Sequence, residues 1–260
     1  MPSKIMIVSD IDDTIKWSHI LGPGVLFDGL DYHLAFKGMP ELYTSLTKAG
    51  AQVFYVTGAP DILIAQLQLN SIPQKVVSTN HFPDGKIFLH QLGESTEDFK
   101  VATITEIMKD KDNLAFDFIL IGDNGEKDIV TYTRLRQDHD IGSRVKEVYI
   151  HKIYNGGSSL EPMADQHPFV TAADLAAMLY GGNFLGAEDL TNVVKIVDQG
   201  MKDNGREHNL TLPFAAQLVP AQVDAIYASL PNTIDSPTLE LLNDIHSLIS
   251  EQAKRGPRKF

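Results

Sequence analysis

The sequence predicts an α/β protein, in which a three-layer α/β/α sandwich with a parallel sheet is followed by an α-helical C-terminal region. Two observations carry this prediction. Short apolar segments alternate with amphipathic helical segments up to about residue 150, which is the pattern of consecutive βαβ units. After about residue 160 only helical periodicity is visible. We therefore expect one domain over residues 1–158 and a helical region over residues 159–260.

The strand predictions depend on short apolar runs rich in β-branched residues, which are typical of buried parallel strands. The helix predictions depend on apolar stripes with Pro near the start or Gly at the end. Strands are predicted over 4–8, 51–56, 74–78, 116–121 and 145–150. Helices are predicted over 37–50, 60–70, 96–110, 126–137, 171–181 and 187–201, with two more beginning at Pro220 and Ser236.

The composition is that of a globular protein with an acidic balance. The chain has 260 residues, of which 43% are hydrophobic, and a formal net charge of −12. Such a charge does not suit nucleic-acid binding, which needs Lys and Arg side chains against the phosphates. The chain has no cysteine, so disulfides, thiolate catalysis and Cys-ligated metals are excluded. Any metal is therefore expected on oxygen or histidine ligands.

No segment approaches the length of a membrane span, and the apolar run near the N-terminus is too short for a signal peptide. A cytoplasmic location is the default expectation, with export by a non-classical route and peripheral membrane contact left open. The oligomeric state is not indicated by any sequence pattern.

Two insertions are predicted to cover the sheet edge. Residues 16–37 are expected to form a flap, and residues 80–95 a hairpin around Pro83-Asp84-Gly85. The apolar flap residues are more simply explained by packing onto the sheet than by contact with acyl chains. These are Leu21, Val25, Leu26, Phe27 and Leu30. Such small covers leave an open site, which admits a reacting group carried by a large molecule such as a lipid or a protein.

Polar residues follow several predicted strands at the point where each strand ends. In a parallel sheet these carboxyl ends share one edge, where ligands bind. We therefore expect the side chains after each strand to lie close together. They are Asp10 and Asp12, Thr57 and Gly58, Asp123 and Asn124, and His151.

Asp10 and Asp12 are the candidate catalytic pair. One carboxylate can attack a phosphoryl group to form an acyl phosphate, while the other transfers the proton. Asp13 is expected to be a turn or hydrogen-bonding residue that helps to orient the other two. Alone, this acidic stretch could equally be a turn that caps a helix.

A hard cation such as Mg²⁺ would offset the repulsion between an acidic site and an anionic substrate. Asp123 is the predicted second metal ligand beside Asp10. Asp128 and Asn124 are expected in the surroundings of the metal, where they would orient a ligand or a water molecule. The alternative for this glycine-containing stretch is an ordinary turn.

Thr57, Gly58 and Lys100 are the candidate phosphate-binding residues. The Thr57 hydroxyl and the Gly58 backbone amide can approach phosphoryl oxygens closely, and Lys100 can supply a point charge. Taken alone, Lys100 is more simply a solvated side chain, and residues 56–60 a loop between a strand and a helix. The order of all these residues along the chain favours the functional interpretation.

These residues resemble the four motifs of the haloacid-dehalogenase-like phosphatase superfamily. The motifs are Asp10-Ile11-Asp12-Asp13-Thr14, Thr57, Lys100, and Gly122-Asp123 with Asp128. The resemblance implies that Asp10 is the nucleophile and Asp12 the acid/base. It also implies that Asp10, Asp123 and the Asp12 backbone carbonyl hold Mg²⁺, and that Thr57 and Lys100 hold the phosphate.

A narrower resemblance is to the catalytic domain of the actin-patch phosphatidate phosphatases. It is carried by SDIDDTIKWS, KGMPELYTSL, FYVTGAP, FPDGKIFLH and LIGDNGEKD, and it implies phosphatidate as the substrate. Residues 57–60 depart from the Ser-rich stretch of that family, and the helical region has no clear counterpart. The alternatives are a phosphoprotein (phosphotyrosine) phosphatase with an open site, and a non-catalytic phospho-receiver or binding module, which needs no acid/base at position 12.

Overall fold

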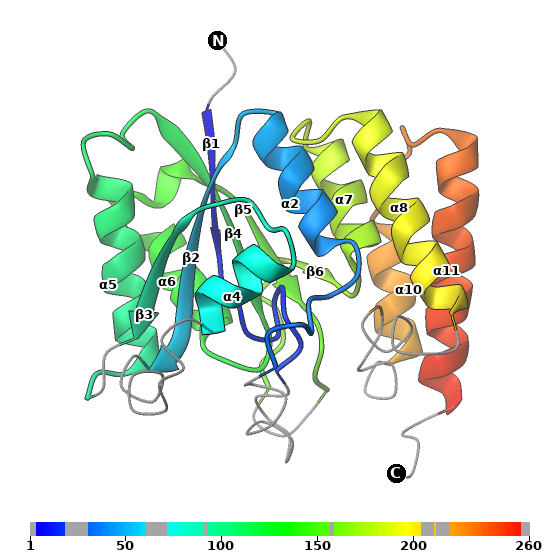
Figure 1. The fold of residues 1–260 in the computed structure, drawn as a ribbon, viewed down its shortest axis with the longest axis horizontal. Helices are drawn as coiled ribbons and strands as arrows, with labels where there is room; N and C mark the ends of the chain where they lie inside the picture. Colours follow the sequence, from blue (N-terminus) through cyan, green and yellow to red (C-terminus); the bar gives the residue numbers. More distant parts are fainter. Residues whose placement is uncertain are drawn as a thin grey trace.

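Six strands form one parallel sheet with the order β3-β2-β1-β4-β5-β6 (Figure 1). This computed structural model describes residues 4–18, 31–60, 72–90, 93–155, 159–203, 211 and 219–255. The strands are β1 (Lys4–Ser9), β2 (Gln52–Pro60), β3 (Lys86–His90), β4 (Phe116–Asp123), β5 (Val145–His151) and β6 (His167–Phe169).

Helices lie on both faces of the sheet, which confirms the predicted three-layer α/β class. The helices are α2 (Met39–Lys48), α4 (Ile72–Thr79), α5 (Thr96–Lys109), α6 (Asp128–Gln137), α7 (Ala172–Gly181), α8 (Ala187–Lys202), α10 (Pro220–Ala228) and α11 (Ser236–Arg255), with a 3-10 turn η1 (Gly142–Arg144). Figure 1 shows α5 and α6 on one side of the sheet and α2, α7, α8, α10 and α11 on the other.

Alternation along the central strands explains why both faces are covered. In β1, Met6 and Val8 pack in the cluster beneath α5 and α6, whereas Ile7 packs in the cluster on the opposite face. A strand buried on both faces is a continuous apolar run. This is the pattern from which β1 and β4 were predicted.

The C-terminal helices share a core with the sheet. α8 packs on α2 and α7, and α11 packs on α8. The cluster that contains Ile7 of β1 also contains Leu175 of α7, Val194 of α8 and Ile245 of α11, all fully buried. The helical region is therefore joined to the sheet by one continuous apolar core, with α2 and α7 nearest to the strands.

The strand predicted over residues 74–78 is wrong, because these residues belong to helix α4. The β-branched pair Val76 and Val77 suggested a strand, but both side chains are buried in the same cluster. In a strand, neighbouring side chains point to opposite faces. Pro73 lies in the first helical turn, where a missing N–H costs little, so packing outweighs strand propensity here.

The hairpin predicted over residues 80–95 is also wrong. Lys86–His90 forms strand β3, which pairs parallel to β2 with Phe54 opposite Lys86 and Thr57 opposite Leu89. The stretch Pro83-Asp84-Gly85 leads from helix α4 into β3. It therefore connects a helix to a parallel strand instead of two antiparallel arms.

Strand β6 is a further difference, because only helices were expected after residue 160. It is three residues long and pairs parallel to β5, with Tyr149 opposite His167. So short a strand contains too few residues to show alternation. The sheet thus extends into the region assigned to helices.

Two predicted segments lie largely outside the described residues. The helix predicted over 60–70 falls there except for Pro60, which ends β2. The apolar flap residues between 21 and 30 also lie outside them. The two ends of the flap run antiparallel, since Trp17 N–H donates to the Leu34 carbonyl at 2.8 Å and Phe36 N–H to the Ile15 carbonyl at 3.0 Å.

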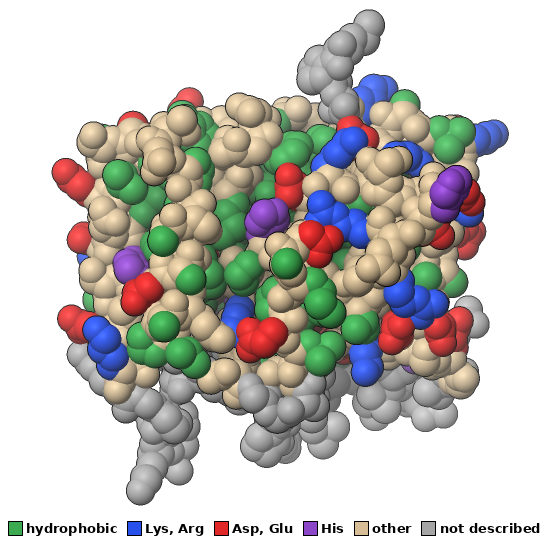
Figure 2. All heavy atoms as spheres, turned by 180° about the vertical axis from the view of Figure 1, so that it is seen from behind, with side chains coloured by type: hydrophobic (Ala, Val, Ile, Leu, Met, Phe, Trp, Pro, Cys, Tyr) green, Lys and Arg blue, Asp and Glu red, His purple; other side chains and the backbone are tan. Residues whose placement is uncertain are grey.

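Charged side chains of both signs are interspersed over the face of the molecule shown in Figure 2. Opposite charges also pair in the described residues, for example Lys146 with Asp117 at 3.3 Å and Lys109 with Asp140 at 3.3 Å. Of the helices in the described part of the chain, none combines the length and the apolar character needed to cross a membrane.

A capping box formed by Thr171 and Asp174 begins helix α7, which was predicted over residues 171–181. The Thr171 hydroxyl accepts from Ala173 N–H at 3.2 Å, while the Asp174 carboxylate accepts from Thr171 N–H at 2.9 Å and from Val170 N–H at 2.6 Å. Asp174 is fully buried, and burial raises the pKa of its carboxyl group to about 6 from 3.8.

We predict that Asp174→Ala lowers the free energy of unfolding by about 2 kcal/mol at pH 7, because two buried N–H groups lose their acceptor. The folded pKa of Asp174 lies above its unfolded value, so its contribution to stability is lost as the pH rises through about 6. The penalty should therefore be larger at pH 4 than at pH 7. Urea denaturation at both pH values measures it, and Glu188→Ala, in the exposed first turn of α8, should change stability by less than about 0.5 kcal/mol.

Candidate active site

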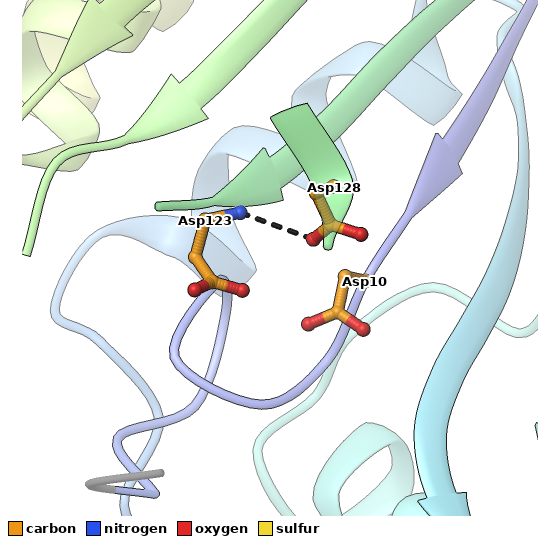
Figure 3. A group of neighbouring side chains, drawn as sticks. All are labelled: Asp10, Asp123 and Asp128. Carbon is orange, nitrogen blue, oxygen red and sulfur yellow. Dashed lines mark hydrogen bonds between the residues drawn. The ribbon is translucent and has the colours of Figure 1, made fainter. Parts of the chain in front are cut away.

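Three buried aspartates meet at the carboxyl edge of the sheet. Asp10 follows β1, Asp123 ends β4 and Asp128 begins α6. One carboxylate oxygen of each lies within 4.8 Å of the other two, and Figure 3 shows the three side chains facing a common space. The structure thus brings together Asp10 and Asp123, as predicted, and places Asp128 in the same cluster.

Local backbone geometry places Asp128 against the end of β4. Asp123 N–H donates to Asp128 Oδ2 at 3.2 Å (Figure 3). A Cβ atom at Gly122 would lie only 2.6 Å from Asp128 Cβ. Glycine at position 122 therefore lets the first turn of α6 approach the strand closely.

Lys100 crosses from α5 into this cluster and is itself buried. Its Nζ atom lies 2.9 Å from Asp10 Oδ1, 2.6 Å from Asp128 Oδ1 and 3.1 Å from Glu126 Oε2. Burial by itself lowers the pKa of Lys100, but Asp10, Asp128 and Glu126 raise that pKa well above its usual value. The lysine is therefore held as a cation at the centre of the site.

Lys100 pairs with three carboxylates and Asp123 adds a fourth to the cluster, so the site has an excess of negative charge. Burial raises the pKa of Asp10 well above its usual value, although Lys100 acts in the opposite direction. Burial, together with the charges of Asp128 and Asp10, also raises the pKa of Asp123. A group that prefers its neutral form for these reasons would be stabilised as a carboxylate by a further cation.

Two buried carboxylate oxygens in the cluster have no hydrogen-bond partner among the described residues. They are Asp10 Oδ2 and Asp123 Oδ2. Buried polar atoms normally have a partner, and carboxylate oxygens are the preferred ligands of hard divalent cations. The donor atoms of Asp10, Asp123 and Asp128 therefore fit a divalent metal ion.

Asp12 lies beside this cluster and is partly exposed, with 18% of its side chain accessible. Its Oδ2 accepts from the Thr57 hydroxyl at 3.2 Å, and its Oδ1 accepts from the Ser18 hydroxyl and lies 3.5 Å from Lys16 Nζ. The structure thus places Thr57, within β2, beside Asp12. Asp12 is held at the solvent side of the site, where a substrate oxygen would arrive.

Asp13 has the structural role predicted for it. It adopts a left-handed backbone conformation with φ 57°, which Asp tolerates better than most residues. Its Oδ1 accepts from Ser18 N–H at 2.7 Å, and its Oδ2 accepts from the Tyr154 hydroxyl. These bonds fix the turn that presents Asp10 and Asp12.

The side chain of Asn124 holds the segment after β5. Its amide nitrogen donates to the Tyr154 carbonyl at 2.7 Å, and its oxygen accepts from Ile153 N–H at 2.9 Å. These contacts show that Asn124 supports this loop, and its predicted place beside a metal ligand stays a prediction. His151 is packed between the rings of Phe36 and Phe169, and burial lowers the pKa of its imidazole to about 4.

Comparison with known proteins identifies the family. Residues 5–152 match the family model described as phosphatidate phosphatase APP1, catalytic domain. The chain belongs to this family. The curated protein named phosphatidate phosphatase APP1 of Saccharomyces cerevisiae is 32% identical over 146 residues, a match that covers 51% of this chain and 23% of the yeast protein. The match thus spans less than a quarter of that relative's length, and the family match ends at β5.

Membership of this family confirms the resemblance stated from the motifs. The matched residues include every element that positions the aspartate cluster and Lys100. Helices α7, α8, α10 and α11 lie outside the match. Because α7, α8 and α11 share an apolar core with the sheet, they support the matched residues from one face of that sheet.

Three residues at the site were not found from the sequence. Glu126 binds Lys100, while Lys16 and Ser18 bind Asp12. Glu126 lies between Asp123, a predicted metal ligand, and Asp128, which was predicted in the surroundings of the metal. This position in the stretch GDNGEKD was an available signal. Lys16 and Ser18 follow the first motif directly, in a segment interpreted only as the start of a flap.

We predict that Lys100→Met lowers the free energy of unfolding by about 3–5 kcal/mol, because Asp10 and Asp128 lose a buried cation. Added Mg²⁺ should restore part of this loss by supplying a replacement charge. Thermal and urea denaturation with and without Mg²⁺ measure both effects.

Lys109→Met on the same helix is the matched control. Lys109 is half exposed and pairs with the exposed Asp140, so we expect a change of less than about 0.5 kcal/mol with no dependence on Mg²⁺. Equal losses in the two variants would contradict the central role given to Lys100.

Proposed function

We propose that this chain is a Mg²⁺-dependent phosphatase that hydrolyses phosphate monoesters through an aspartyl-phosphate at Asp10. The observation that carries the proposal is the cluster of Asp10, Asp123 and Asp128, with Asp12 close by. Within the described residues, one oxygen of Asp10 and one of Asp123 have no hydrogen-bond partner. The family match supports the same reaction class.

Asp10 and Asp123 would hold the metal ion, with Asp128 orienting them from the start of α6. When bound, Mg²⁺ would neutralise charge on the phosphoryl oxygens and on the acidic cluster. The family resemblance adds the backbone carbonyl of Asp12 as a ligand. The structure supports this set because these residues converge at the ends of β1 and β4.

In the first step, a carboxylate oxygen of Asp10 attacks phosphorus while the bond from phosphorus to the leaving oxygen breaks. Asp12 gives its proton to that oxygen, so the product leaves as an alcohol. Asp12 suits this role because it is partly exposed, whereas Asp10 is buried and held by Lys100.

In the second step, Asp12 takes a proton from a water molecule, which attacks the phosphorus of the acyl phosphate. The bond between phosphorus and Asp10 breaks, and inorganic phosphate leaves. The Thr57 hydroxyl keeps Asp12 in position at 3.2 Å. Lys100 stabilises the charge on Asp10 and on the phosphoryl oxygens throughout.

Phosphatidate is the substrate that we propose first, since the family and the yeast relative are named for its hydrolysis. We infer that the chain meets this lipid at the cytoplasmic side of a membrane by peripheral contact. The sheet edge that carries Asp12 would then face the lipid headgroup.

We predict that wild type releases phosphate from p-nitrophenyl phosphate only with Mg²⁺, and that Asp10→Asn abolishes release. Asp12→Asn should lower the rate by about 10²–10⁴-fold, the range for general acid–base catalysis. Asp13→Asn should lower it by less than about tenfold, because Asn tolerates the left-handed backbone and keeps one acceptor.

Folding of each variant is checked by circular dichroism. Turnover by folded Asp10→Asn at the wild-type rate would rule out Asp10 as the nucleophile. A wild-type protein that becomes phosphorylated and keeps its phosphate would instead identify a phospho-receiver.

We also predict which class of substrate is hydrolysed fastest. Vesicles of phosphatidylcholine with phosphatidate should release phosphate faster than phosphotyrosine peptides at equal phosphate concentration. Vesicles of phosphatidylcholine with phosphatidylglycerol, a phosphodiester, are the matched control and should release none. Faster release of phosphate from the peptides would identify a phosphoprotein, and not the lipid, as the substrate. Release from sugar phosphates alone would contradict the prediction of an open site.

A further inference from the structure

Glu126 occupies a position that a phosphate group would need. Its Oε2 lies 3.1 Å from Lys100 Nζ. A Cβ atom at Gly58 would lie 2.9 Å from Oε2 and 3.2 Å from Oε1 of the same carboxylate. The Glu126 carboxylate therefore lies between the ammonium group of Lys100 and the backbone of Gly58, the two groups assigned to phosphate binding.

The contacts of Lys100 leave no donor for a substrate. An ammonium group has three N–H donors, and the three carboxylates of Asp10, Asp128 and Glu126 are all within 3.1 Å of Nζ. A phosphoryl oxygen can therefore reach Lys100 only if one of the three carboxylates moves away.

Exposure shows which carboxylate can move. The side chains of Asp10 and Asp128 are 1% and 0% exposed, whereas that of Glu126 is 18% exposed. Asp128 also accepts from Asp123 N–H. Within the described residues, the carboxylate of Glu126 is bound by Lys100 alone, while the Glu126 backbone N–H donates to Asp123 Oδ1 at 3.1 Å. Its side chain can rotate while the loop stays in place.

We propose that Glu126 is a displaceable placeholder for the substrate phosphate on Lys100. The Glu126 carboxylate completes the set of three acceptors around Lys100 next to Gly58. When a phosphate group enters, its oxygens replace this carboxylate, which turns toward solvent. Glu126 is thus a positioning residue that sets the affinity for phosphate, and this role rests on the proposed phosphatase function.

The proposal predicts that removing the competitor strengthens phosphate binding. Inorganic phosphate, titrated calorimetrically into the protein with and without Mg²⁺, should bind Glu126→Gln about fivefold or more tightly than wild type, the lower end of measured couplings between competing ligands. General damage to the site would weaken binding instead. In assays with p-nitrophenyl phosphate, KM should fall by a larger factor than kcat changes.

Two further variants separate displacement from a general effect of charge. Glu126→Asp keeps the charge, but its side chain is one methylene too short to hold Lys100. If Glu126 is displaced by phosphate, this variant should bind phosphate more tightly than wild type. If only the charge matters, its phosphate affinity should equal that of wild type. Asp98→Asn removes an exposed charge from the first turn of α5, where Asp98 pairs with Arg134 at 3.0 Å. We expect phosphate affinity in this variant to equal that of wild type.

Unchanged phosphate affinity in both Glu126 variants would overturn the placeholder, and so would failure of phosphate to bind any of the proteins. Failure of the proposed function has a different signature, because wild type would then show no turnover of any phosphate ester. Tighter phosphate binding in both Glu126 variants, with unchanged phosphate affinity in Asp98→Asn, would establish Glu126 as the placeholder.

Discussion

The site depends on the partial compensation of the negative charge of several buried carboxylates by one buried lysine. Burying a carboxylate without a partner is expensive, and here Asp10, Asp123 and Asp128 converge within 4.8 Å. Lys100 pairs with Asp10 and Asp128, but the second oxygens of Asp10 and Asp123 have no partner among the described residues. The fold therefore holds a site in which a further cation is favourable before any substrate arrives.

The sheet keeps these groups together. Asp10 and Asp123 lie at the ends of the paired strands β1 and β4, which are buried on both faces. Lys100 reaches the edge from α5, and Asp128 does so from α6, where Gly122 permits the close approach. Helices α2, α7, α8 and α11 stabilise the opposite face through one continuous apolar core. The chemistry is thus placed by strands that cannot shift without loss of the core.

The central strands and the aspartates at their ends could be predicted because both leave a local signal. An apolar run followed by Asp marks a strand end, and parallel strands share their carboxyl edge. Glu126 lies between two residues predicted at the site, but its contact with Lys100 joins residues 26 positions apart, which no local pattern shows. Helix α4 was missed because Val76 and Val77 favour a strand locally, whereas packing on the core decides their structure. Asn124 directly follows Asp123, and its side chain also holds a loop that no sequence pattern indicated.

Calorimetric titration of Mg²⁺ into the substrate-free protein tests the central claim most directly, because it measures charge compensation apart from turnover. The account predicts saturable binding at one site in wild type and its loss in Asp123→Asn, which removes an unpartnered buried oxygen. Asp140→Asn, which neutralises an exposed carboxylate that pairs with Lys109, should bind Mg²⁺ as wild type does. Equal binding by wild type and folded Asp123→Asn would contradict the account.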